Sequence, residues 1–185
     1  MTVQPTSLNG LRLVVMGVSG CGKTTTAQAL AARLHLAMVD GDDLHLPESI
    51  RKMSSGIALE DADRWPWLDR IGEYLASSPQ PQQAGRIAAC SALKRAYRDR
   101  IRAHAPGVVF VFLHGDALTL RQRMALRVGH YMLPGLLESQ LRTLEIPGDD
   151  ETDVLHLGID QRVDDLVTRT LDALAMLTTP SSSAA

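Results

Sequence analysis

The chain has 185 residues, of which 45% are hydrophobic and 22% charged, and its formal net charge at pH 7 is −2. This length allows one well-filled core, and the small negative charge gives no support for a nucleic-acid or anionic-membrane partner. The basic segment 94–102 does not change this view, because a helix distributes its charges over more than one face. We expect that segment to be a solvated helix.

Two cysteines, Cys21 and Cys90, are too few for a disulfide framework, which fits a reducing compartment. No apolar run approaches the ~18 residues that a membrane span needs. We therefore expect a soluble protein of the cytoplasm, without a membrane partner.

Short apolar runs alternate with helical patterns along the chain. The predicted strands are 11–16, 37–39, 87–90, 108–113 and 154–157. The predicted helices are 23–34, 67–76, 92–103, 118–127, 136–144 and 163–177. Strands that are apolar on both faces and separated by helices predict an α/β fold with a parallel sheet covered on two sides. We expect one domain over residues 10–177, between a loose arm at 1–9 and a flexible tail at 178–185.

A phosphate-binding motif follows the first predicted strand. Residues 17–24 read Gly-Val-Ser-Gly-Cys-Gly-Lys-Thr and match the P-loop pattern G-x-x-x-x-G-K-[ST]. An apolar strand precedes the motif and a helix follows it, which is the context that a P-loop requires. Glycines let backbone N–H groups converge on a β-phosphate, and the helix amino terminus adds the positive end of its dipole. A glycine-rich turn without a ligand is the alternative interpretation.

The P-loop residues have distinct predicted roles. Lys23 bridges the β- and γ-phosphates and is a catalytic candidate, while the Thr24 hydroxyl is a Mg²⁺ ligand. Thr25 is a candidate for the α-phosphate, and Cys21 is a spacer. ATP and Mg²⁺ are therefore the expected cofactors. The predicted nucleotide-binding residues of the motif are Gly17, Val18, Ser19, Gly20, Cys21, Gly22, Lys23, Thr24 and Thr25.

Three acids, Asp40, Asp42 and Asp43, follow the second predicted strand. Ligands gather at the carboxyl ends of parallel strands, so these acids are expected near the P-loop. In an extended chain, Asp40 and Asp42 point the same way and Asp43 points out. We assign Asp40 to the Mg²⁺ shell through water, and Asp42 to a substrate hydroxyl that its carboxylate orients. His45 is a candidate substrate contact or, alternatively, a helix-start histidine in solvent.

Beyond the P-loop, eight segments together carry a resemblance. They are 16–24, 40–45, 52–56, 61–68, 90–98, 129–132, 140–145 and 149–153. In order and spacing they resemble the bacterial gluconokinase family, small P-loop kinases related to shikimate and nucleoside-monophosphate kinases. The Asp-Gly-Asp, Cys-Ser-Ala-Leu-Lys and Gly-His segments are more specific than the P-loop, which many NTPases share. The chain departs from the family's pattern at Cys21, usually serine, at Ala62, often an acid, and at Ile146, usually polar.

The resemblance implies ATP-dependent phosphorylation of D-gluconate on its 6-hydroxyl, giving 6-phosphogluconate. It also implies a three-layer P-loop kinase fold with a five-stranded parallel sheet, a mobile lid at about residues 127–136, and a homodimer. Gluconate is a polyhydroxylated anion, and Arg64 is the first choice for its carboxylate because a guanidinium can donate two hydrogen bonds to it. The candidate cations in the matching segments are Lys52, Arg64, Lys94 and Arg98, each of which is alternatively a surface charge.

Four further residues have predicted roles, and those of the two arginines come from the related kinases. Ser91, at the end of the third predicted strand, is a candidate contact to substrate or to a metal-bound water. Arg123 is expected on the adenine side, and Arg127 is expected to meet the charge of the transition state. For both arginines a salt-bridged helix surface is the alternative. His130 is expected to move with the lid and to reach the substrate when the lid excludes water.

Two other functions compete with a gluconate kinase. One is a P-loop kinase for shikimate or a nucleoside monophosphate, although Asp42, His45 and Arg64 suit a polyol acid better than a nucleobase. The other is a nucleotide-dependent switch or binding module, which has no use for a hydroxyl-facing acid. A GTPase needs an Asn-Lys-x-Asp element after a middle strand, whereas residues 113–116 read Leu-His-Gly-Asp.

Overall fold

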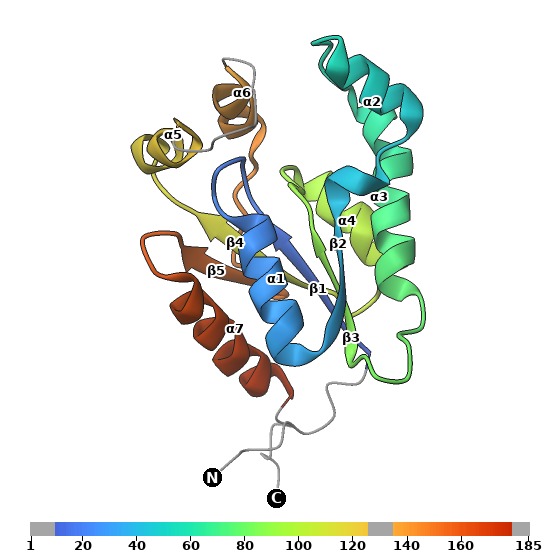
Figure 1. Cartoon of the computed structure of the whole chain (residues 1–185), viewed down its shortest axis with the longest axis vertical. Helices are drawn as coiled ribbons and strands as arrows, with labels where there is room; N and C mark the ends of the chain where they lie inside the picture. Colours follow the sequence, from blue (N-terminus) through green and yellow to red (C-terminus); the bar gives the residue numbers. More distant parts are fainter. Residues whose placement is uncertain (1–9, 126–134, 179–185) are drawn as a thin grey trace, which may run out of the picture.

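The computed structural model describes residues 10–125 and 135–178, in which five strands form one parallel sheet (Figure 1). The strand order is β2-β3-β1-β4-β5. The strands are β1 (Leu11–Met16), β2 (Leu36–Asp40), β3 (Gly85–Ala89), β4 (Val109–His114) and β5 (Val154–Gly158). Each strand begins and ends within two residues of a predicted apolar run, so the predicted parallel α/β sheet is confirmed.

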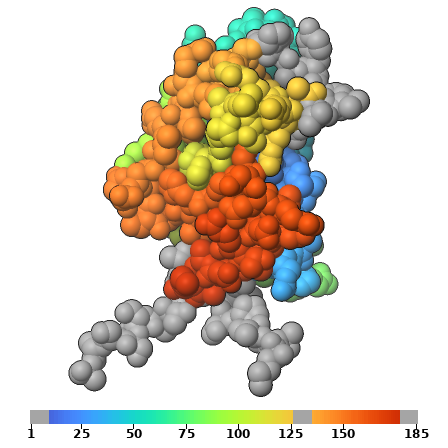
Figure 2. Space-filling model, turned by 90° about the vertical axis from the view of Figure 1, so that its left-hand side faces the viewer, coloured from blue at the N-terminus to red at the C-terminus, as the bar shows by residue number. Residues whose placement is uncertain are grey.

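Helices cover both faces of the sheet, because alternate strand residues point to opposite sides. One apolar cluster joins the sheet to α1, α5, α6 and α7, and includes Leu13, Val15 and Val111. The other joins the sheet to α3 and α4, and includes Val14 and Phe110. The bounds of these helices are α1 (Lys23–Leu34), α3 (Asp61–Ala76), α4 (Arg95–His104), α5 (Ala117–Ala125), α6 (Leu136–Thr143) and α7 (Val163–Thr178). Figure 2 shows α5, in yellow, between the orange residues around α6 and the red residues of α7.

The segment after β2 is helical where an extended chain was expected. Residues Gly41–Leu44 form a 3-10 helix, η1, whose first turn is capped because the Asp40 side chain accepts a hydrogen bond from the Asp42 N–H. A further helix that the sequence patterns did not predict, α2 (Pro47–Ser54), follows directly. Proline at its start is favourable, because the first N–H groups of a helix have no partner within the helix.

Two other helices begin at different residues from those predicted. Helix α3 begins at Asp61 rather than at residue 67, because Glu60 and Asp63 form a capping box that satisfies its first N–H groups. It accommodates Pro66 in its second turn. Helix α4 begins at Arg95 rather than at residue 92, because Ala92 has a left-handed φ of 44° that interrupts a helix.

The carboxyl ends of the three strands β2, β3 and β1 lie at one edge of the sheet. Asp40 is level with Ala89 on β3, which is level with Val15 on β1. The Gly17 N–H donates to the Ser91 carbonyl across 3.3 Å, so the chain after β3 contacts the P-loop directly. The fold therefore gathers the P-loop, η1 and Ser91 at this edge, as the sequence predicted.

The predicted arm, the tail from residue 179 and most of the predicted lid lie outside the described residues. Within 10–125 and 135–178, no helix is both long and apolar enough to cross a membrane.

Candidate active site

The loop between β1 and α1 has backbone geometry that only glycine supplies. Gly17, Gly20 and Gly22 have φ values of 136°, 83° and 95°, which L-residues with side chains rarely adopt. A Cβ on Gly17 would lie 2.4 Å from the Leu113 carbonyl oxygen. The Lys23 ammonium donates to the Val18 carbonyl across 3.1 Å, so the lysine folds back over its own loop. This is the backbone arrangement that binds phosphates at a helix amino terminus.

Thr24 and Asp40 place two hard oxygen ligands next to each other. The Thr24 hydroxyl donates to Asp40 Oδ2 across 2.9 Å, and Asp40 Oδ1 accepts the Asp42 N–H across 3.1 Å. Mg²⁺ in nucleotide sites takes one or two protein oxygens and completes its octahedral shell with phosphates and water, so this pair fits that ion. The described residues contain no group of three or more His, Cys, Asp and Glu side chains able to bind a metal by themselves.

Asp42 lies on the same edge of the sheet as Lys23, although not for the reason that was predicted. Its segment is the 3-10 helix η1, so the expected alternation of an extended chain is wrong. The position is nevertheless retained, because the Asp40 carboxylate accepts hydrogen bonds both from the P-loop residue Thr24 and from the Asp42 N–H. Burial raises the pKa of Cys90 to about 12, opposed by a backbone hydrogen bond and Lys23. The Asp42 side chain itself is exposed and therefore accessible to an acceptor molecule.

His45 is buried, so its alternative interpretation as a histidine in solvent is wrong. Its ring stacks on Trp67 with centroids 4.5 Å apart and an interplanar angle of 11°. Burial lowers the pKa of His45, partly opposed by Asp42, which favours the neutral ring. Its buried Nδ1 has no hydrogen-bond partner among the described residues. Trp67 in turn donates its indole N–H to the Gly41 carbonyl across 2.6 Å, which ties η1 to α3.

Three predicted cations meet two acids at the start of α3. Lys94 donates to Asp61 across 2.7 Å, and the Arg64 Nη1 group lies 3.3 Å from the same carboxylate. Lys52 pairs with Asp63 across 2.6 Å. Lys94 and then the Tyr97 hydroxyl lower the pKa of Asp61.

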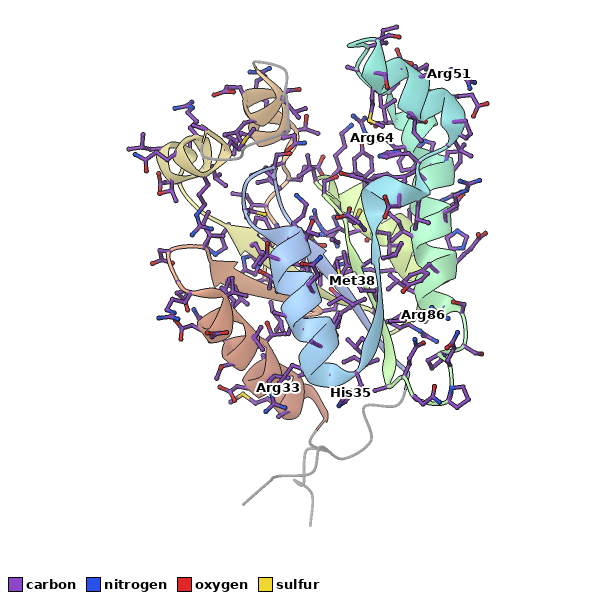
Figure 3. The ribbon with its side chains drawn as sticks, viewed as in Figure 1. Arg33, His35, Met38, Arg51, Arg64 and Arg86 are labelled. Carbon is purple, nitrogen blue, oxygen red and sulfur yellow. The ribbon has the colours of Figure 1, made fainter. Side chains whose placement is uncertain are left out.

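The Arg64 guanidinium is only partly used by these contacts. Its Nη1 donates to Asp61 and to the Tyr97 hydroxyl, and within the described ranges no hydrogen bond engages its Nε or Nη2. Figure 3 shows Arg64 extending from α3 toward the side that carries the P-loop, while Arg51 lies on the outer side of α2. Arg64 therefore keeps donors available for an anion on the acceptor side.

Comparison with known proteins identifies the family, although no family model matches the chain. The chain is 42% identical over 161 residues to the thermoresistant gluconokinase of Escherichia coli K12, covering 87% of this chain and 91% of that protein. It is 48% identical over 139 residues to the gluconokinase of Gluconobacter oxydans 621H, covering 75% and 78%. A crystal structure of a gluconokinase from Sinorhizobium meliloti 1021 superposes with a TM-score of 0.80 at 47% identity, covering 91% and 93%. The chain belongs to the gluconokinase family.

More distant structures support the fold alone. The chain matches shikimate kinase from Aquifex aeolicus with a TM-score of 0.55 at 13% identity, and thymidylate kinase from Candida albicans with 0.62 at 14%. Together with the five-stranded parallel sheet, these matches confirm the predicted P-loop kinase fold.

Arg98 is a structural residue and not an available substrate cation. Its side chain is 1% exposed and pairs with Glu151, whose side chain is 2% exposed. The Nη1 group of Arg98 also donates to the Leu93 and Glu145 carbonyls across 3.3 and 3.1 Å. The expectation of a solvated helix holds for Arg95 and Arg100, whose side chains are 50% and 46% exposed. The exposed and half-buried arginines also pair with acids outside α4, namely Arg95 with Asp150, Arg100 with Asp69 and Arg102 with Asp153.

Of the residues predicted on the adenine side and in the lid, only Arg123 lies within the described residues. Arg123 is half-buried and its guanidinium donates to the Ile159 carbonyl, in the connection that follows β5. Helix α5, which carries Arg123, lies against the P-loop, because a Cβ on Gly20 would lie 2.7 Å from the Met124 side chain. Arg127 and His130 lie outside the described residues, and their roles in a gluconokinase lid stay predictions.

Several contacts in the candidate site were not found from the sequence. Asp61 and Tyr97 join the cation cluster, and Gln140 accepts a hydrogen bond from the Ser19 N–H across 2.6 Å. All three lie in segments that match the gluconokinase pattern, so the resemblance marked their neighbourhoods. No spacing rule assigns their contacts, because each depends on how separate helices pack together.

Proposed function

We propose that this protein transfers the γ-phosphoryl group of ATP to the 6-hydroxyl of D-gluconate. The main support is the position of Asp42 beside the P-loop, with an unshared part of the Arg64 guanidinium on the acceptor side. One site then contains the P-loop to bind a triphosphate, the Asp42 carboxylate to orient a hydroxyl and the Arg64 guanidinium to bind a carboxylate. The gluconokinase names of the relatives are consistent with this combination.

In this proposal the nucleotide phosphates bind the P-loop N–H groups, and Lys23 leaves the Val18 carbonyl to bridge the β- and γ-phosphates. Thr24 directly and Asp40 through water would bind Mg²⁺, which offsets phosphate charge when bound. Thr25, exposed in the first turn of α1, would contact the α-phosphate, and Arg123 the adenine.

Asp42 orients the 6-hydroxyl, whose oxygen bonds to the γ-phosphorus while the bond to the departing ADP oxygen breaks. The hydroxyl proton passes to the Asp42 carboxylate as the transfer completes, or later from the phosphorylated product to water. Arg64, helped by Lys94 and Lys52, holds the gluconate carboxylate through charge-assisted hydrogen bonds. His45, through its unpartnered Nδ1, and Ser91 are candidate contacts for the remaining hydroxyls.

The decisive experiment measures ATP consumption with gluconate, other aldonates, shikimate, AMP and water alone. Stimulation by gluconate only supports the proposal, whereas equal turnover without an acceptor would identify an NTPase. Asp42→Asn should lower turnover by about two orders of magnitude or more, with ATP-analogue affinity changed less than about twofold. Asp43→Asn is the matched control, since Asp43 is an exposed acid of the same helix. Near-normal turnover of Asp42→Asn would remove that residue from the chemistry.

We further propose a homodimer and a cytoplasmic location. Both follow from the family resemblance, and the two free, buried cysteines suit a reducing compartment. Light scattering of the purified chain tests the dimer, since a monomer mass at micromolar concentration would contradict it.

A further inference from the structure

A side chain of helix α6 forms a hydrogen bond with the P-loop. Gln140 Oε1 accepts the Ser19 N–H across 2.6 Å, between residues 121 positions apart in the sequence. Ser19 is 9% exposed, so water does not readily replace this partner. Figure 1 shows α6 and α5 on the same side of the molecule, beyond the carboxyl end of β4. The contact thus links the P-loop to a helix that lies far from it in the sequence.

Gln140 belongs to a short segment, residues 140–145, that also forms hydrogen bonds with the residues on either side of Lys94. Five residues later, the Glu145 N–H donates to the Leu93 carbonyl across 2.9 Å. The Glu145 carboxylate accepts the Arg95 N–H across 2.7 Å. Leu137, one turn before Gln140, is 3% exposed and anchors α6 in the core. The segment 140–145 therefore joins the loop that binds the nucleotide to the chain that carries Lys94.

The chemistry of a glutamine suits this position. A P-loop works by presenting N–H groups and positive charge to phosphates. Gln140 takes up the Ser19 N–H itself, so the other N–H groups of the loop remain for phosphates, and an acceptor beside them should carry no negative charge. The side-chain amide of Gln140 accepts through Oε1 and keeps its NH₂ group as a donor. A glutamate of the same shape would keep the accepting oxygen but add an anion beside the triphosphate.

We propose that Gln140 is a positioning residue for nucleotide binding, which fixes the Ser19 end of the P-loop from α6 without adding negative charge. It does not touch the reacting atoms. The proposal requires only that the P-loop binds ATP, and it holds whether or not gluconate is the acceptor.

The test compares Gln140→Met, which loses the acceptor, with Gln140→Glu, which keeps the acceptor and adds charge. Calorimetry with a non-hydrolysable ATP analogue and Mg²⁺, without any acceptor, reports nucleotide affinity in the full chain. We expect Gln140→Met to weaken binding by about threefold to tenfold, the effect of one lost hydrogen bond. Gln140→Glu should weaken it by about a further tenfold, and raised salt should reduce this excess. Gln122→Glu, at an exposed glutamine of α5, is the matched control and should leave affinity unchanged.

Thermal unfolding separates positioning from a purely structural role. Because glutamate keeps the hydrogen bond, Gln140→Glu should be at least as stable as Gln140→Met while binding the nucleotide less well. If Gln140→Glu instead binds as well as or better than Gln140→Met, or if both variants bind like the wild type, the proposal is wrong. A wild-type chain that binds no ATP analogue overturns it as well, whereas failure with gluconate alone affects only the proposed function.

Discussion

The ion pair of Glu151 with Arg98 joins α4 to the segment before β5 and is almost completely buried. Glu151 accepts from Arg98 Nε across 2.7 Å and from Arg102 Nη2 across 2.8 Å. Replacing Glu151 by glutamine keeps the size of the side chain but removes its charge. Two guanidinium groups then lose their shared anion, and one of them has a side chain that is only 1% exposed.

Two approaches to the magnitude agree. Breaking a buried ion pair by removing one partner typically costs about 3–5 kcal/mol. Independently, the hydrogen bonds from Arg98, opposed by burial and supported by Arg102, lower the pKa of Glu151 from 4.5 to about 2. A difference of this size corresponds to about 3 kcal/mol in favour of the charged form in the folded state. We therefore expect Glu151→Gln to lower the free energy of unfolding by about 3–5 kcal/mol at pH 7.

The sign of the pH dependence follows from the lowered pKa. The contribution of the Glu151 charge is complete above pH 4.5, the unfolded value, and disappears as the pH falls toward about 2. The difference between the wild type and Glu151→Gln should therefore shrink when urea denaturation, followed by tryptophan fluorescence, is repeated at pH 3. Glu48→Gln is the matched control, because Glu48 and Arg51 are 67% and 69% exposed, and it should cost less than about 1 kcal/mol. A loss below about 1 kcal/mol for Glu151→Gln, or one that does not shrink in acid, would refute this reasoning.

Two substitutions and one reactivity measurement test the packing around the site. Gly41→Ala places a Cβ 2.6 Å from the Ala89 carbonyl oxygen, and should destabilise the chain by about 1–3 kcal/mol in urea denaturation; an unchanged midpoint would contradict that close approach. Trp67→Phe removes the donor to the Gly41 carbonyl and should cost about 1–3 kcal/mol, with stability equal to wild type counting against the bond. Cys90, whose pKa is raised to about 12, should react with a thiol reagent at mildly alkaline pH only after unfolding. Rapid reaction of the native chain would show that the thiol is not buried.

The nucleotide half of the site was largely predictable because its signals are local. An apolar strand, glycines at special φ values and a helix start occur within one short stretch, and helix α1 begins and ends at the predicted residues 23 and 34. The strand positions were also predictable, since strands buried on both faces of a parallel sheet appear in the sequence as continuous apolar runs. Asp40 ends β2 and Asp42 follows two residues later, so the topology alone brings them to the P-loop.

For the acceptor half, the motif segments indicated which parts of the chain form the site, but not which residues in them are available to bind a substrate. Arg64 and Arg98 look alike in sequence, but Arg98 is buried against Glu151, 53 positions away, while Arg64 keeps free donors. Whether an arginine is buried or available depends on the orientation of its helix about the helix axis. That orientation depends on the other elements that pack against the helix.

Sequence alone thus determined the P-loop, the sheet and the family, because the signals for each lie in contiguous residues. Only the tertiary structure decided that His45 is buried on Trp67, that Arg98 is structural and that Gln140 holds the Ser19 N–H. These outcomes depend on contacts between distant segments. The free energy of such contacts comes from shared burial and hydrogen bonding, which neither segment encodes by itself.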